Sequence, residues 1–298
     1  MMVAKASPLS HQSWEYEPLI PRGLVVGIDG SVESLVALEF AETLARRRHC
    51  CLHAVMAIPV SASFQVVPGT DRTRDYIDRL RVTLKYGELR EMLAAAGFDG
   101  DWTCEIGVGH PAEVLAAVGE SRAAEFVVVG RRQHGVIERA FTRETALQIM
   151  HLATVPVLAV HPGAGLVHTA VAAIDFQPAS IAAARSAVSL LGGDGRLFLV
   201  HVMPEGDRGH GRAAELEAVA AAIGRDNSTT IETVVLTGST VASVVAFAGE
   251  KKADLIACGS FTHSQLRRVF LGTVSTALVR TAQCHVLIAP PGHGQSGH

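Results

Sequence analysis

Two aspartates stand at positions where a carboxylate could meet a ligand. Asp29 follows the apolar run LVVGI and Asp175 follows TAVAAI, and the pattern of an amphipathic helix comes after each. A carboxylate at the end of a buried strand can accept hydrogen bonds from a base or a ribose. It can equally stabilise the N-terminus of the next helix. Both interpretations stay open, because a helix cap repeats in two places as readily as a ligand contact does.

A second chemical feature is the segment GSFTHSQLRRVFLGTVST, which follows an apolar run in the C-terminal half. Gly259 begins the segment, and Gly272 and Thr273 open the helix expected at its end. Glycine lets the backbone approach a phosphate closely, and a helix N-terminus presents free N–H groups with a partial positive charge. The segment therefore indicates an anion site, although a glycine before a helix also occurs without any ligand.

Both features recur because the chain repeats itself. The run AEFVVVGRRQHG aligns with ADLIACGSFTHS, which sets Gly130 opposite Gly259. The second strands align as CLHAVMAIP with LFLVHVMPE, so His53 is expected opposite His201. The first copy has the longer second helix, so the two copies are homologous but unequal.

Each copy alternates strands with segments long enough for a helix. Apolar strands with few polar residues between them are typical of a parallel sheet covered on both faces. The sequence predicts an α/β fold of two tandem doubly wound domains, whose ligands bind beyond the carboxyl ends of the strands. Pro and Gly in HPGAGLVH mark the boundary. The expected parts are an N-terminal arm at 1–21, domains at 22–162 and 166–291, and a flexible tail at 292–298.

Composition limits the classes of function. A net charge of −3 with scattered basic residues gives no footprint for nucleic acid, and no apolar run reaches the roughly 20 residues of a membrane span. Residues 1–21 lack the pattern of a signal peptide. The five cysteines form no C-x-x-C pair and are odd in number, which argues against a disulfide framework and a zinc site. We expect a cytoplasmic protein without a metal centre.

Other reactive side chains have plainer explanations. The adjacent Cys50 and Cys51 open a strand expected to be buried, which favours packing over redox chemistry. His134 and His263 occupy equivalent loop positions but have no Ser or Cys partner nearby in the sequence, so exposed loop histidines are favoured over general bases. No residue is assigned a catalytic role.

Both halves resemble domains of the universal stress protein family over about residues 22–291. The resemblance rests on the strand-ending aspartate, the histidine of the second strand, and a motif in which Gly, Gly, and Gly with Ser or Thr are separated by two and nine residues. It implies a Rossmann-like fold of the adenine nucleotide alpha hydrolase type, with the halves related by a pseudo-two-fold axis. In ATP-binding members, the aspartate and the residue after the histidine flank the adenine and ribose, while the glycine motif holds the phosphates. The resemblance therefore implies ATP as the cofactor, accompanied by Mg²⁺.

The second copy carries most of this motif. The nucleotide contacts that the resemblance implies there are Asp175, Val202, Gly259, Thr262, Gly272 and Thr273. Thr262 stands where the middle glycine belongs, and a threonine still offers a backbone N–H and a hydroxyl. We expect any ATP to be bound by the second copy.

The first copy departs further from the motif. Asp29, Ala54 and Gly130 match it and are weaker candidates for nucleotide contacts, whereas Gln133 replaces the middle glycine. The next glycine and the Ser or Thr are replaced as well, so the phosphate end of the motif is lost in this copy.

The replacements at the phosphate end are Arg143 and Glu144. A bulky arginine obstructs the closest backbone approach, and Glu144 adds a like charge beside a phosphate. In one interpretation the first site is a structural relic, in which Arg131, Arg132 or Arg143 fills the cavity and pairs with Glu144. In the other it is retuned to a different anion.

Three functions remain as alternatives. The first is a stress-response protein that senses ATP or a related nucleotide and changes the surface offered to a protein partner. The second is a nucleotide-independent interaction module, and the third is a slow ATP hydrolase, against which stands the lack of a Walker-type motif. Related domains commonly dimerise through the last strand, so VPVLAV and CHVLIA are expected to pair as an intramolecular pseudo-dimer. A further homodimer of chains stays open.

Overall fold

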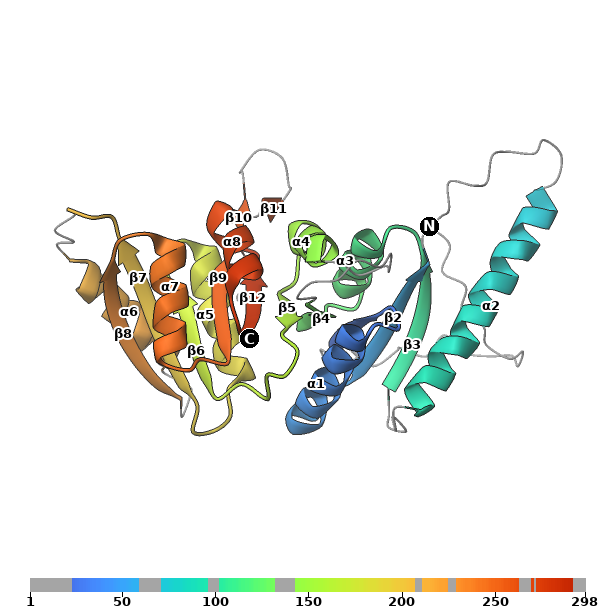
Figure 1. Ribbon diagram of the computed structural model, residues 1–298, viewed down its shortest axis with the longest axis horizontal. Helices are drawn as coiled ribbons and strands as arrows, with labels where there is room; N and C mark the ends of the chain where they lie inside the picture. The colour runs from blue at the N-terminus through green and yellow to red at the C-terminus, as the bar shows by residue number, and fades with distance from the viewer. Residues whose placement is uncertain are drawn as a thin grey trace, which may run out of the picture.

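Strands and helices alternate through both halves of the chain in the computed structural model (Figure 1). The structure describes residues 23–58, 71–95, 102–131, 143–206, 211–224, 229–262, 269–270 and 272–291. The expected arm and tail lie outside these residues, as do Arg132, Gln133, His134 and His263. Among the helices that are described, none is both long and apolar enough to cross a membrane.

The N-terminal half places its apolar runs in strands and its amphipathic runs in helices. The strands are β1 (Leu24–Ile28), β2 (Leu52–Ile58), β3 (Trp102–Val108), β4 (Phe126–Gly130) and β5 (Val157–Val160). The helices are α1 (Val32–Arg48), α2 (Asp71–Ala95), α3 (Pro111–Ser121) and α4 (Arg143–Leu152). Every residue of β1 and β5 is buried, as expected for strands covered on both faces.

The C-terminal half repeats this order with a shorter second helix. Its strands are β6 (Thr169–Ala173), β7 (Arg196–Met203), β8 (Thr230–Thr237), β9 (Leu255–Gly259), β10 (Phe261–Thr262), β11 (Val269–Phe270) and β12 (His285–Ala289). Its helices are α5 (Pro178–Leu190), α6 (Arg212–Gly224), α7 (Thr240–Glu250) and α8 (Thr273–Thr281). The two short strands β10 and β11 pair antiparallel with each other, apart from the main sheet.

The two halves share one sheet of ten strands in the order β3-β2-β1-β4-β5-β12-β9-β6-β7-β8. Its strand pairs are parallel within each half, and the central pair, β5 with β12, is antiparallel. The expected pairing of VPVLAV with CHVLIA is confirmed, with Val157 opposite Ile288 and Ala159 opposite Val286. The antiparallel seam makes the chain an intramolecular pseudo-dimer.

Two layers of helices cover the sheet, and each layer runs across both halves. One apolar cluster packs beneath α1, α2, α5 and α6, with Leu38 and Leu190 among its fully buried side chains. The other packs beneath α3, α4, α7 and α8, with Ile149 and Leu278 among its fully buried side chains. The carboxyl ends of the strands therefore meet the N-terminal ends of helices from both layers, and this edge positions the candidate site.

Candidate functional site

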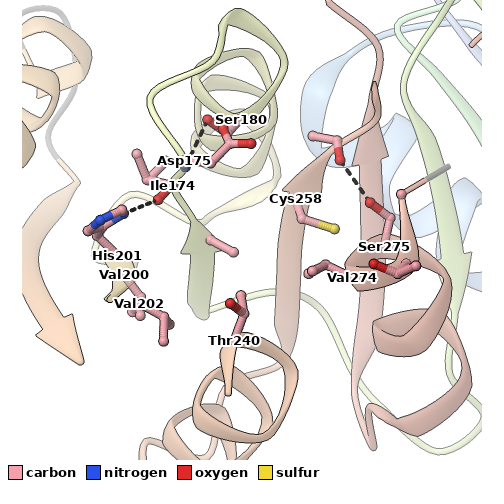
Figure 2. Close-up of a pocket in the computed structure, with 14 residues that line it drawn as sticks. Ile174, Asp175, Ser180, Val200, His201, Val202, Thr240, Cys258, Val274 and Ser275 are labelled. Atoms are coloured by element: carbon pink, nitrogen blue, oxygen red, sulfur yellow. Dashed lines mark hydrogen bonds between the residues drawn. The ribbon is translucent and has the colours of Figure 1, made fainter. Parts of the chain in front are cut away.

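A cavity of about 230 Å³ opens at the carboxyl ends of β6, β7 and β9 in the C-terminal half (Figure 2). Its walls are the ends of these strands and the first turns of α5, α7 and α8. The residues that line it are Ala173, Ile174, Asp175, Ser180, Val200, His201, Val202, Thr240, Cys258, Gly259, Gly272, Thr273, Val274 and Ser275. Its position is the one at which open α/β sheets hold their ligands.

The cavity collects most of the residues singled out in the second copy. Five of them line it together, namely Asp175, Val202, Gly259, Gly272 and Thr273. The sixth, Thr262, lies in β10 opposite Val269, and its side chain lies outside the described part of the structure. Residues far apart in the sequence therefore converge at one edge of the sheet.

The Asp175 carboxylate closes a turn before α5. Its Oδ1 atom accepts a hydrogen bond at 3.0 Å from the backbone N–H of Gln177, the N-cap residue of that helix. Asp29 does the same in the first copy, where its Oδ1 accepts the N–H of Ser31 at 2.9 Å. The Asp175 carboxylate thus stabilises the start of α5 by binding the N-cap residue, and the same residue lines the cavity. A role in the helix start and a role in ligand binding are therefore compatible.

A pair of equivalent serines, absent from the sequence-based site, completes these turns. The backbone N–H of Asp175 donates to Ser180 Oγ at 3.3 Å, and that hydroxyl donates to the carbonyl of Gln177 at 2.9 Å. Ser34 makes the same pair of contacts in the first copy, to Asp29 and Ser31, at the same two distances. Because both serines stand five residues after the aspartate, the repeat itself carried the signal that would have identified them.

Gly259 is required by packing, whatever the cavity holds. A Cβ atom at this position would lie 2.6 Å from the backbone of Ala179 and Ser180 in the first turn of α5. At Gly130 it would meet the backbone of Glu33 and Ser34 in α1 in the same way. The end of the strand therefore touches the helix backbone in both copies, and this contact explains why glycine recurs there.

The first turn of α8 forms the opposite wall of the cavity. Gly272 is its N-cap residue, with extended backbone angles and no side-chain cap, and Thr273 is the first helical residue. Ser275 Oγ donates to the carbonyl of Gly259 at 2.9 Å, which joins this turn to the end of β9. The backbone N–H groups at a helix start carry partial positive charge, so this wall suits an anion.

Cys258 lies in the cavity wall but does not supply a nucleophile. Its side chain is buried beside Val274 and Ser275 (Figure 2). Burial raises the pKa of the thiol to about 12, and the Asp175 charge adds to the rise. The thiol therefore stays protonated at neutral pH, and the thiolate is the reactive form of cysteine.

His201 is held by the framework rather than poised for proton transfer. Its Nδ1 atom lies 2.7 Å from the carbonyl oxygen of Ile174, and because a carbonyl only accepts, Nδ1 carries the hydrogen. The His201 ring packs against the ring of Phe176, with the two centroids 4.7 Å apart. The guanidinium of Arg212 lies over the same Phe176 ring, with its Cζ atom 5.1 Å from the ring centroid. Phe176 adopts a positive φ of 65° at the turn after Asp175. The sequence motif did not identify Phe176 or Arg212.

The structure corrects the alignment of the second strands. Gly27 pairs with Val55 in the first copy, and Ala173 pairs with Val200 in the second. Gly27 and Ala173 each stand two residues before the aspartate of their copy, so their partners Val55 and Val200 are equivalent. Two residues further along each second strand, Ala57 is therefore equivalent to Val202.

Ala54 is therefore three residues away from the position expected for it. It is the third residue of β2, fully buried opposite Val26, and does not lie at the carboxyl end of the strand. Met56, rather than His53, is the residue equivalent to His201 by the same register.

His53 instead lies near the beginning of β2. Its Nδ1 atom is 2.6 Å from Thr103 Oγ1, and its Nε2 atom is 3.0 Å from Glu105 Oε2. The hydrogen bond to His53 and the nearby Arg122 lower the pKa of Glu105, although burial opposes them. These contacts join β2 to β3, so His53 is a structural residue of the sheet.

Arg131, one of the three arginines in the relic interpretation of the first site, makes contacts in the other half of the chain. Its side chain is buried and crosses the seam between the halves, where it donates to carbonyl oxygens of Val279 and Ala282 in the C-terminal half. Arg143 and Glu144 begin α4, and their side chains lie outside the described part of the structure. The first copy thus retains Asp29 and Gly130 at its strand ends without the Gly-Thr helix start of the second.

No group of three or more potential metal-ligating side chains occurs within the described ranges. The fold and this edge define a tandem α/β protein made of two Rossmann-like halves. The chain belongs to the universal stress protein family, whose family model matches residues 22–161 and 167–290. The family and its tandem form, both expected from the sequence, are confirmed.

Individual relatives agree with this assignment. Universal stress protein MJ0531 of Methanocaldococcus jannaschii is 40% identical over 58 residues, so the aligned part spans 20% of this chain and about a third (34%) of that protein. A universal stress protein from Archaeoglobus fulgidus has a similar structure, with a TM-score of 0.64 and 19% identity over 91% of this chain and 99% of its own. Protein PA1789 of Pseudomonas aeruginosa PAO1 is similar at a TM-score of 0.57 and 14% identity, over 92% and 94% of the two chains. The two structural likenesses support the fold.

Proposed function

We propose that the C-terminal half binds ATP or a related nucleotide in the cavity beside Asp175, and that the protein acts in the cytoplasm as a regulatory or sensing module. The observation that carries this proposal is the convergence of Asp175, Gly259 and the Gly272-Thr273 helix start on one cavity. Family membership adds to it, since the motif that these residues match is the one associated with ATP in this family.

Each part of a nucleotide has a chemically suitable wall. Val202 and Val274 offer apolar surface to a base, and the Asp175 carboxylate can accept hydrogen bonds from ribose hydroxyls. The α8 start suits the phosphates. A volume of about 230 Å³ is smaller than the roughly 300 to 1,000 Å³ usual for ligand pockets, so we expect the base and ribose to be enclosed and the phosphates to extend past Gly272.

Binding without efficient catalysis is the expected mode. Cys258 stays protonated, His201 is held by a backbone carbonyl, and the described residues offer no metal cluster. Any Mg²⁺ would arrive with the nucleotide, coordinated by its phosphates. We expect at most slow ATP hydrolysis.

A nucleotide-independent interaction module is the second candidate. The observation that favours it is the packing of Gly259 against α5, which explains this glycine without a phosphate. Thr262 in place of the middle glycine points the same way. Under this alternative the tandem pair would supply shape alone to a protein partner.

The deciding experiment identifies nucleotide released from the purified, denatured protein by chromatography and mass spectrometry. Gly272→Glu should abolish the released ATP, because bulk and negative charge at the helix start exclude phosphate. Arg143→Glu places the same side chain at the equivalent helix start of the first copy and should leave the released ATP unchanged. If the wild-type protein releases none and binds no ATP added at millimolar concentration, the interaction module becomes the better account.

A further inference from the structure

Arginines of the N-terminal half contact the C-terminal ends of two helices in the other half. The buried guanidinium of Arg131 donates through Nη1 to Val279 O at 3.1 Å and through Nη2 to Ala282 O at 2.6 Å. These carbonyls belong to the last turn and C-cap of α8. Carbonyl groups at a helix end have no partner within the helix, and a cation there is favourable.

A second contact of this kind lies at the end of α5. Arg47 and Arg48, the last residues of α1, donate to the carbonyls of Leu190 and Ser189. Arg48 also forms an ion pair with Glu125 of its own half, so its guanidinium joins three segments. Both α5 and α8 are therefore held at their C-terminal ends by side chains from outside their half.

The same two helices begin at the cavity. Ser180 in the first turn of α5 and residues 272–275 at the start of α8 line it. The nine residues of α8 rise about 1.5 Å each, so Arg131 lies roughly 13 Å from the start of that helix. A helix of this length moves as a rigid unit, and a constraint at one end also fixes the position of the other.

The residue equivalent to Arg131 in the C-terminal half makes no matching contact among the described residues. Ser260 is the residue equivalent to Arg131, because each follows the glycine that ends its strand. The Ser260 hydroxyl donates at 3.2 Å to Ala289 O within its own half, and a serine is too short to cross the seam. The N-terminal half, whose own glycine motif is degenerate, thus stabilises α8 in the C-terminal half, which retains more of that motif.

We infer that Arg131 is a positioning residue for the cavity of the C-terminal half. It holds the C-terminal end of α8 and thereby the backbone N–H groups that this helix presents at Gly272. The nature of the ligand rests on the proposed function, but the constraint on α8 does not. The N-terminal half therefore has a defined structural role in the tandem chain, which is to hold α8 in a fixed position beside β9.

The test compares Arg131→Met, Arg131→Lys and Leu158→Ala in the full chain. Arg131→Met keeps the length of the stem and removes the donors, whereas Arg131→Lys keeps a charge and restores part of the bonding. Leu158→Ala weakens the β5–β12 seam from the other face of the sheet, in the apolar cluster that contains no residue of α8, and controls for a general loss of stability. Two quantities are measured well below the melting temperatures. They are amide hydrogen exchange across residues 276–282 in the ligand-free protein, and the dissociation constant for ATP by calorimetry.

We expect Arg131→Met to speed exchange in α8 by roughly tenfold and to weaken ATP binding by about the same factor, the size of losing a charge-assisted hydrogen bond. Arg131→Lys should recover part of both, and Leu158→Ala should change neither. Unchanged exchange in Arg131→Met, or equal acceleration in Leu158→Ala, would overturn the inference. An α8 that loosens while ATP affinity stays at the wild-type value would also overturn it. If the wild-type protein binds no ATP, the proposed function fails, and the exchange data still decide whether Arg131 holds α8.

Discussion

His285 Nδ1 accepts a hydrogen bond from the backbone N–H of His161 at 3.0 Å, across the junction of the two halves. The other ring nitrogen, Nε2, lies 2.9 Å from the carbonyl of Gly165 and donates to it. This network assigns a neutral imidazole with its hydrogen on Nε2. The ring is fully buried and packs against Phe40 of α1 at a centroid distance of 4.8 Å. One side chain thus joins β12, α1 and the segment that connects the halves.

The buried His285 predicts that stability falls in mild acid. Burial lowers the pKa of His285 from its ordinary value of 6.5; the nearby His161 and Arg131 lower it further, and the Gly165 bond and Asp254 oppose them. Below about pH 6.5 the unfolded chain therefore binds a proton that the folded chain resists, so the free energy of unfolding decreases as the pH falls.

The measurement is the melting temperature between pH 8 and pH 5. We expect His285→Gln to be less stable at pH 8 but to lose less on acidification than the wild type. His161, whose pKa is also lowered by burial, keeps a residual slope in the variant. Equal slopes in both proteins would show that the pKa of His285 is the same in the folded and unfolded chains.

Asp175→Asn separates the two tasks of the Asp175 side chain. The amide oxygen can still accept the N–H of Gln177, so we expect the melting temperature to change little. The lost negative charge weakens hydrogen bonds to ribose hydroxyls, and we expect ATP affinity to fall about tenfold, as for one charge-assisted bond. Calorimetric titration measures the affinity, and Asp29→Asn is the matched control that should leave it unchanged. Wild-type affinity in Asp175→Asn would remove this carboxylate from the nucleotide site.

Gly130→Ala and Gly259→Ala should destabilise the protein to a similar extent. The added methyl group enters the backbone of α1 or α5, and such overpacking costs about 1 to 3 kcal/mol. Chemical denaturation with urea measures the loss, and Gly165→Ala serves as a control, because nothing lies within 4 Å of a Cβ atom there and its φ is not positive. If Gly259→Ala retained wild-type stability while losing ATP binding, a phosphate contact would be the better explanation of this glycine.

The cysteines should differ sharply in reactivity. Cys258 and Cys284 are buried, and burial raises their pKa values to about 12 and about 11. Cys51 is exposed just before β2. Iodoacetamide at pH 8, followed by peptide mass spectrometry, should label Cys51 within minutes and leave the two buried thiols unmodified until the protein unfolds. Early labelling of Cys258 would mean that the cavity opens often enough to expose this buried thiol to the reagent in the folded protein.

The convergence at the cavity could be predicted from sequence because it depends on topology. Asp175 and Gly259 end parallel strands, and carboxyl ends of parallel strands meet at one edge of the sheet. The β5–β12 seam was predicted from the resemblance to domains that dimerise through their last strand, and the need of an exposed strand edge for a partner agrees with that prediction. Neither inference required side-chain detail.

The register of β2 could not be fixed in the same way. Its residues are buried almost throughout, so the strand has no polar alternation to anchor an alignment. The shared histidine suggested that His53 matches His201, and the error displaced Ala54 by three residues. Pro59 and Pro204, which follow the two strands, would have been the better anchors.

The contacts of the Arg131 side chain could not be predicted from any local sequence pattern. A long basic side chain after a glycine suggested a filled phosphate cavity, and nothing near it in the sequence indicates Val279 or Ala282. Its partners are backbone carbonyls, which every residue possesses. Contacts of this kind become visible only when the halves are placed against each other.

The antiparallel seam of β5 and β12 also changes how the protein responds to its own concentration. A pair of separate subunits dissociates on dilution, whereas two halves on one chain face each other at an effective concentration set by residues 161–168. Each half is also freed from having to recognise an identical copy of itself. One can lose its glycine motif and gain arginines that suit only its neighbour, a division of labour that a symmetric dimer of identical chains has no means to keep.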